Sequence, residues 1–157
     1  MNNPHATLRR CAVKFRIFVP CDKGRPIMDI IDFREYCMRF PCVEETLPFD
    51  DVTLCYKVAG RIFAAADMES FDCFVVKTEP AAADELRERY PEITAARHWN
   101  SRWWCSVSVV GDLPDRLLRR MIDDSYVLTV RRNVTPRALR DEIQRLSPAL
   151  FADSAGR

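Results

Sequence analysis

The feature that most constrains the fold is a pair of short apolar runs joined by two residues. Residues 52–58 and 61–65 flank Ala59-Gly60, and two such runs around a glycine-containing link predict a β-hairpin. Residues 72–77 form a further short apolar run, which predicts a third strand. The chain therefore predicts an antiparallel sheet, entered through a polar turn over residues 44–51.

Helical segments are predicted before and after these strands. Between residues 29 and 40 the apolar side chains recur at helical spacing, and Pro41 ends the stripe. A second helix is predicted over residues 81–90 and a long one from Pro114, with a strand over residues 103–110 between them and a last helix from Pro136 to Leu146. Elements in this order predict an α+β fold, in which the helices pack on one face of an antiparallel sheet.

The chain divides into three segments. Residues 28–147 are the predicted domain, and residues 148–157 are expected to be a frayed tail. Residues 1–27 carry six basic groups and one acidic group, a net charge of +5. They are either a flexible basic arm or a stretch that precedes the natural start. We favour the second interpretation, because a well-formed helix signal opens at Met28.

Charge is distributed unevenly along the rest of the chain. Residues 28–157 hold 18 basic and 22 acidic groups, a net charge of −4. Within them, residues 28–92 have a net charge of −8 and residues 93–157 a net charge of +4. Such a balance excludes a uniformly basic nucleic-acid binder. The domain instead has an uneven charge distribution, with a negative N-terminal half and a positive C-terminal half.

The sequence indicates a cytoplasmic protein without a membrane partner. No run approaches the roughly 20 uncharged apolar residues of a membrane helix, and the N-terminus lacks the apolar centre of a signal peptide. The seven cysteines are odd in number and have no CxxC spacing. We therefore expect reduced cysteines, no disulfide and no metal site.

The signatures of the common enzyme classes are absent from the sequence. The four glycines cannot form a GxGxxG or Walker-type phosphate loop, and neither GxSxG nor HExxH occurs. His5 and His98 are the two histidines, so a catalytic triad would depend on His98. We therefore expect a binding protein with no catalytic activity and no cofactor.

The most distinctive segment is residues 97–104, which hold three indoles, two guanidinium groups and an imidazole. Aromatic rings can stack on bases, and guanidinium groups can contact phosphates. The alternative is a structural role, because neighbouring strand residues point to opposite faces of a sheet. We expect Trp104 to be buried and Trp103 to be more exposed.

The last helices are rich in arginine. They and the segment joining them carry Arg116, Arg119, Arg120, Arg131, Arg132, Arg137, Arg140 and Arg145. A row of arginines can contact phosphates. Acidic residues are interleaved with these arginines, which favours solvated helices with internal ion pairs.

Several segments carry a resemblance to a known family. They are residues 44–49, 54–64, 76–77 and 85–91, the trio His98, Asn100 and Trp104, residues 113–115, and Ser125-Tyr126. In this order and spacing they resemble the MmcQ/YjbR family of small bacterial proteins, from Met28 to about Leu146. The resemblance implies a fold similar to that of the CyaY/frataxin group and a role in DNA binding.

The expected DNA contacts come from two places in the sequence. They are Lys57, Arg61 and Lys77 from the strands, and Arg97, His98, Asn100, Arg102 and Trp103 from the loop that opens the positive half. The cations would contact phosphates, and Trp103 or His98 would stack on an exposed base. The alternative is a protein-interaction or small-ligand-binding domain, with residues 98–104 as the rim of a pocket.

Overall fold

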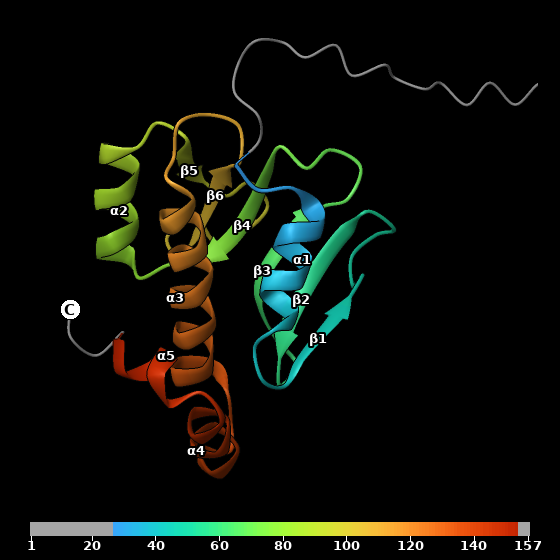
Figure 1. Cartoon of the computed structure of the whole chain (residues 1–157), viewed down its shortest axis with the longest axis vertical. Helices are drawn as coiled ribbons and strands as arrows, with labels where there is room; N and C mark the ends of the chain where they lie inside the picture. Colours follow the sequence, from blue (N-terminus) through green and yellow to red (C-terminus); the bar gives the residue numbers. More distant parts are fainter. Residues whose placement is uncertain (1–26, 154–157) are drawn as a thin grey trace, which may run out of the picture.

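The computed structural model describes residues 27–153 (Figure 1). The elements are α1 (Ile30–Met38), β1 (Val43–Thr46), β2 (Thr53–Val58), β3 (Arg61–Asp67), β4 (Cys73–Lys77), α2 (Pro80–Arg89), β5 (Ile93–Ala95), β6 (Trp104–Ser108), α3 (Asp115–Asn133), α4 (Arg137–Leu146) and α5 (Pro148–Asp153). The strands form a six-stranded sheet in the order β1-β2-β3-β4-β6-β5. Every neighbouring pair in the sheet is antiparallel.

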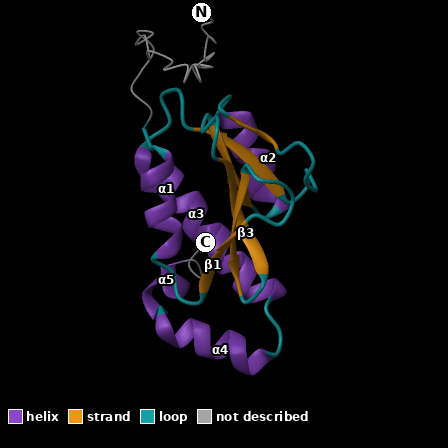
Figure 2. Ribbon diagram, turned by 90° about the vertical axis from the view of Figure 1, so that its right-hand side faces the viewer, coloured by secondary structure: helices purple, strands orange, loops and turns teal. Residues whose placement is uncertain are grey.

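The predicted α+β fold is confirmed. Helices α1 and α3 lie against one face of the sheet (Figure 2), and aromatic side chains fill the space between the layers. The ring of Phe33 on α1 stacks on Phe74 with centroids 4.9 Å apart and meets Tyr56 edge-on at 5.5 Å. Phe40 stacks on Tyr126 of α3 at 4.6 Å. These rings bury a large apolar area, the main stabilising contribution to such a core.

Two strands were not predicted. Residues 44–51 were expected to be a turn, but Val43–Thr46 form β1 and pair with β2. Ile93–Ala95 form β5 and pair with β6. Both lie at the edges of the sheet, where one side of a strand meets solvent and charged residues such as Glu44 are tolerated. Neither strand therefore shows a clear apolar pattern of its own.

The expectation of a frayed tail from residue 148 was wrong for its first part. Pro148–Asp153 form α5, because Phe151 has a buried site on α3. The Phe151 ring lies 6.3 Å from that of Tyr126, and its carbonyl accepts a 2.8 Å hydrogen bond from Arg131 Nη2. Residues 154–157 lie outside the described part of the chain.

The first described residues, Ile27 and Met28, pack against the core. Met28 is completely buried, and the Ile27 amide donates to the Val109 carbonyl at 3.2 Å. The two interpretations of residues 1–27 concern a segment that lies, except for Ile27, outside the described residues. Within residues 27–153, no helix has both the length and the apolar character needed to cross a membrane.

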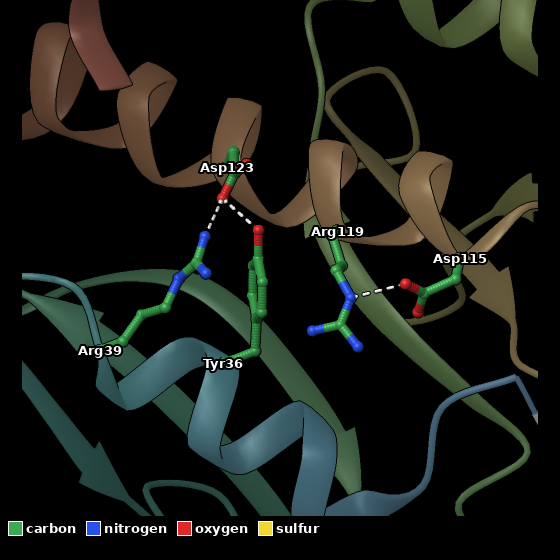
Figure 3. Close-up of polar contacts among 5 residues, drawn as sticks. All are labelled: Tyr36, Arg39, Asp115, Arg119 and Asp123. Carbon is green, nitrogen blue, oxygen red and sulfur yellow. Dashed lines mark hydrogen bonds and ion pairs between the residues drawn. The ribbon is translucent and has the colours of Figure 1, made fainter. Parts of the chain in front are cut away.

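A polar cluster fastens α1 to α3. The Tyr36 hydroxyl donates to Asp123 Oδ1 at 2.9 Å, and Arg39 Nη2 reaches the same oxygen at 3.3 Å (Figure 3). The Tyr36 ring lies between the guanidinium groups of Arg39 and Arg119, which are 3.6 and 5.0 Å from its centroid. Burial, then the Asp123 charge, raises the pKa of Tyr36, so the hydroxyl stays protonated and donates at neutral pH.

Tyr36→Phe is expected to lower the free energy of unfolding by about 1–2 kcal/mol, because it leaves a half-buried carboxylate with one donor fewer. Urea unfolding monitored by circular dichroism measures the change. Asp124→Asn is the control, since Asp124 is exposed and follows Asp123 on the same helix. An equal loss in both variants would contradict a role for the Tyr36 hydroxyl.

Candidate nucleic-acid interface

Antiparallel pairing brings the predicted cations to one end of the sheet. Strand β2 runs toward this end through Lys57, and β3 leaves it at Arg61, with Val58 opposite Arg61. Strand β4 reaches the same end at Lys77, which lies opposite Trp104 at the start of β6. Residues 97–103 connect β5 to β6 here, so all eight predicted residues lie at or beside this end. We call it the sheet end; α4 lies beyond it (Figures 1 and 2).

The 97–103 loop is a tight turn held by its own backbone. His98 has a φ of +64°, a left-handed conformation that histidine adopts more readily than most residues. The Asn100 carbonyl accepts from the amides of Trp103 and Trp104 at 2.9 and 3.0 Å. Asn100 Oδ1 accepts from the Arg102 amide at 3.1 Å. The Asn100 oxygens therefore shape the loop.

Neighbouring elements hold the loop from both sides. Arg87 Nη2 on α2 donates to the Ser101 carbonyl at 2.6 Å and to the Trp104 carbonyl at 3.0 Å. The Trp99 ring packs on Trp104 with centroids 4.4 Å apart and meets Phe49 edge-on at 5.9 Å. The loop is thus fixed in place, and the side chains of Arg97, His98 and Arg102 remain exposed.

The expected difference between the two neighbouring tryptophans is confirmed. Trp104 is 8% exposed, whereas Trp103 is partly exposed. The guanidinium of Arg132 lies 5.2 Å from the centroid of the Trp103 ring, and Arg132 also pairs with Glu79 at 2.7 Å. A base that stacks on Trp103 would therefore have to share the ring with Arg132 or displace it.

Lys77 is the central cation of the sheet end. Its Nζ donates to Asn133 Oδ1 at 2.6 Å and lies 5.5 Å from the centroid of the Trp104 ring. Burial lowers the pKa of Lys77, and the charges of Arg61 and Arg132 lower it further. Among the described residues, the ammonium of Lys77 therefore has a neutral amide oxygen, and no negative charge, as its hydrogen-bond partner.

Ser125 on α3 fixes the position of the Lys77 backbone. Its hydroxyl donates to the Phe63 carbonyl at 2.5 Å and accepts from the Lys77 amide at 2.7 Å. The ladder between β3 and β4 runs through Ala64 opposite Val76, so the next pair in the register would be Phe63 and Lys77. The Ser125 hydroxyl replaces the direct bond between them. Helix α3 is thereby tied to the point where β4 presents Lys77.

The predicted cations of the sheet end lack the ion pairs that most of the other arginines in the described part of the domain form. Within residues 27–153, Lys57, Arg61, Lys77, Arg97 and Arg102 form no ion pair. The expectation of internal ion pairs in the C-terminal helices is confirmed for Arg119–Asp115, Arg120–Asp124 and Arg137–Asp141. Arg132 pairs instead with Glu79, at the start of α2. Positive charge at the sheet end is therefore open to an external anion.

Three residues of this site were missed from the sequence. Ser125, Arg132 and Asn133 lie in the second half of α3, about 50 residues after Lys77. Arg132 was noted as a member of an arginine-rich helix, and Ser125 as part of a family motif. Their contacts with β4 depend on tertiary packing. A polar residue at a position on α3 that faces the sheet was the available signal for Ser125.

The cysteines and acidic groups form no cluster at this site. Among the described residues, no group of three or more histidine, cysteine and acidic side chains is arranged to hold a metal ion. Cys37, Cys55 and Cys105 are buried and unpaired. Burial raises the pKa of Cys55 to about 11, so this thiol stays protonated at neutral pH.

Comparison with known proteins identifies the relatives of this fold. The sequence profile of the YjbR family matches residues 38–128. The chain belongs to the YjbR family. Over 100 residues it is 31% identical to the protein YjbR of Escherichia coli K12, described as uncharacterized, covering 63% of this chain and 85% of that protein. It is 28% identical over 98 residues to YbdF of Escherichia coli O157:H7, covering 62% of this chain and 80% of the relative.

Solved structures agree with this assignment. The YjbR-family chain is similar to the Deinococcus radiodurans protein DR2400, a DUF419 domain, with a TM-score of 0.70 and 32% identity over 76% of this chain and 90% of that one. A Pseudomonas syringae protein shares the fold, with a TM-score of 0.55 and 20% identity over 65% of this chain and 99% of that one. The resemblance to the YjbR family and the predicted α+β fold are therefore confirmed.

Proposed function

We propose that this YjbR-family protein binds DNA through the sheet end and catalyses no reaction. The observation that carries the proposal is a group of five cations at one end of one sheet, none of which forms an ion pair with another residue of the described range 27–153. Cations that lack a partner in the protein gain most from contact with phosphates, and they release bound counterions from the nucleic acid. This local surface supports DNA binding although residues 28–157 have a net charge of −4.

In this proposal the cations have different tasks. Arg61, Arg97 and Arg102 are exposed and contact phosphates along the strand. Lys77 is half-buried beside Asn133 and donates to one phosphate at a fixed position. Such contacts orient the domain without reading the sequence of bases. His98, whose side chain is exposed in the 97–103 loop, supplies a ring for an unpaired base.

The Glu79 carboxylate would compete with DNA phosphates for the guanidinium of Arg132. It holds Arg132 at 2.7 Å beside Lys77 and Trp103. Glu79→Gln is expected to raise DNA affinity about two- to fivefold, because it removes one exposed ion pair and frees a cation. It should also steepen the dependence of log K on log salt by about 1. Titration of labelled DNA by fluorescence anisotropy measures both quantities.

The matched control is Asp115→Asn. It removes one negative charge and frees Arg119 from its 2.7 Å pair at the start of α3, away from the sheet end. We expect this variant to keep the salt dependence of the unmodified protein. Equal gains in affinity for the two variants would show that only total charge matters and would contradict a specific role for Arg132.

A further inference from the structure

A groove lined by residues of α2 and α3 lies beside the sheet end. Figure 1 shows the positions of the two helices. Its volume is about 680 Å³, within the range of pockets that hold small organic ligands. Leu86 on α2 forms part of one wall, and Leu117 and Met121 on α3 form part of the other. These side chains give the groove apolar walls suited to an apolar body, beside the charged side chains of Glu85, Arg120 and Asp124, which also line it.

The end of the groove at the C-terminus of α3 is positive. Lys77, Arg131 and Arg132 line it, together with Glu79, whose carboxylate pairs with Arg132 at 2.7 Å. Within residues 27–153 no carboxylate pairs with Lys77, whose ammonium donates to the Asn133 amide oxygen at 2.6 Å. A half-buried ammonium without a counter-charge has lost part of its hydration. The lowered pKa of Lys77 agrees with this environment, and an anion at this end of the groove would compensate the charge.

We propose that the groove binds a small amphipathic carboxylate, with its apolar body between α2 and α3 and its carboxylate at Lys77. This location differs from the one expected from the sequence, in which residues 98–104 form the rim. The groove reaches that loop through Arg132, whose guanidinium lies over Trp103. The proposal does not depend on DNA binding, although Lys77 takes part in both.

Octanoate and 1-octanol provide a matched pair of probes, because they share an apolar chain and differ in charge. Titration of the full chain, followed by amide chemical shifts, is expected to show saturable shifts on both walls of the groove. Octanol should bind at least about 10-fold more weakly, the value of one hydrogen bond to a charged group. Equal affinities, or octanoate shifts centred on exposed apolar residues such as Ile31 and Phe49, would overturn the proposal.

Two substitutions on α2 test the location. Ala82 lines the groove, whereas Ala81 does not, and both are exposed. Ala82→Trp fills the groove and is expected to abolish octanoate binding, while Ala81→Trp leaves it unchanged. Octanoate binding by Ala82→Trp with unchanged affinity would contradict the proposal. Salt-dependent DNA binding should be the same in both variants, so failure of one proposal is distinguishable from failure of the other.

Lys77→Met provides a test that does not depend on filling the groove. It keeps an unbranched side chain and removes the ammonium, and we expect it to weaken octanoate binding about 10-fold. Octanol binding should not change, because the apolar walls are intact. Unchanged octanoate affinity would show that Lys77 does not hold the carboxylate and would overturn the assignment.

Discussion

Ser125→Ala is expected to lower the free energy of unfolding by about 2–4 kcal/mol, because it leaves a buried carbonyl and a buried amide without partners. The two groups are the Phe63 carbonyl and the Lys77 amide, which Ser125 bridges at 2.5 and 2.7 Å. Ser125 is completely buried. In a domain of this size the loss corresponds to a fall in Tm of roughly 5–15 °C. Urea and thermal unfolding measure the change.

Thr129→Val is the matched control for Ser125→Ala. Thr129 lies one turn later on α3 and is also completely buried. Its hydroxyl has no hydrogen-bond partner among the described residues. Replacing an unpaired hydroxyl by a methyl group of similar size is expected to be neutral or slightly stabilising. If Ser125→Ala cost no more than Thr129→Val, the hydroxyl bridge would not stabilise the junction of β3 and β4.

The second large effect concerns DNA affinity. The triple variant Arg61→Gln, Arg97→Gln and Arg102→Gln is expected to bind DNA roughly 30- to 100-fold more weakly at low salt, because each exposed charge pair contributes up to about 1 kcal/mol. The three side chains are exposed and form no ion pair within residues 27–153. Their removal should therefore leave the free energy of unfolding nearly unchanged.

The control for this triple variant removes the same charge elsewhere. Arg34→Gln, Arg116→Gln and Arg120→Gln alter α1 and the N-terminal half of α3. Both triple variants keep residues 1–27, whose net charge of +5 contributes equally to each. We expect the control to bind DNA within a few fold of the unmodified protein. Fluorescence anisotropy with single- and double-stranded DNA compares them, and equal losses would show that no particular surface is used.

Much of the fold was predictable because its signals are local. The hairpin of β2 and β3 follows from two apolar runs around Ala59-Gly60, and Pro80 marks the start of α2. Strands β1 and β5 and helix α5 were missed because these elements form only by contact with partners distant in sequence. Phe151, for example, has little helical signal of its own and is ordered by contact with α3.

The candidate site was predictable to a smaller extent, for the same physical reason. Its cations were recognised by residue type and by their place on strands and a loop. Their common location follows from the antiparallel register, which a hydrophobic pattern does not specify beyond a hairpin. The Ser125 bridge, the Asn133 contact of Lys77 and the groove beside α2 arise where α3 crosses the sheet. These features require the packed structure.

The most direct test of DNA binding at the sheet end is a salt series with the unmodified protein and both triple variants. We expect a linear fall of log K with log salt. In the Arg61, Arg97 and Arg102 variant the slope should be smaller in magnitude by about 2–3, the value of three lost phosphate contacts. In the Arg34, Arg116 and Arg120 variant the slope should match that of the unmodified protein. Equal slopes for the two triple variants, or no affinity for DNA at the lowest salt, would contradict DNA binding at the sheet end.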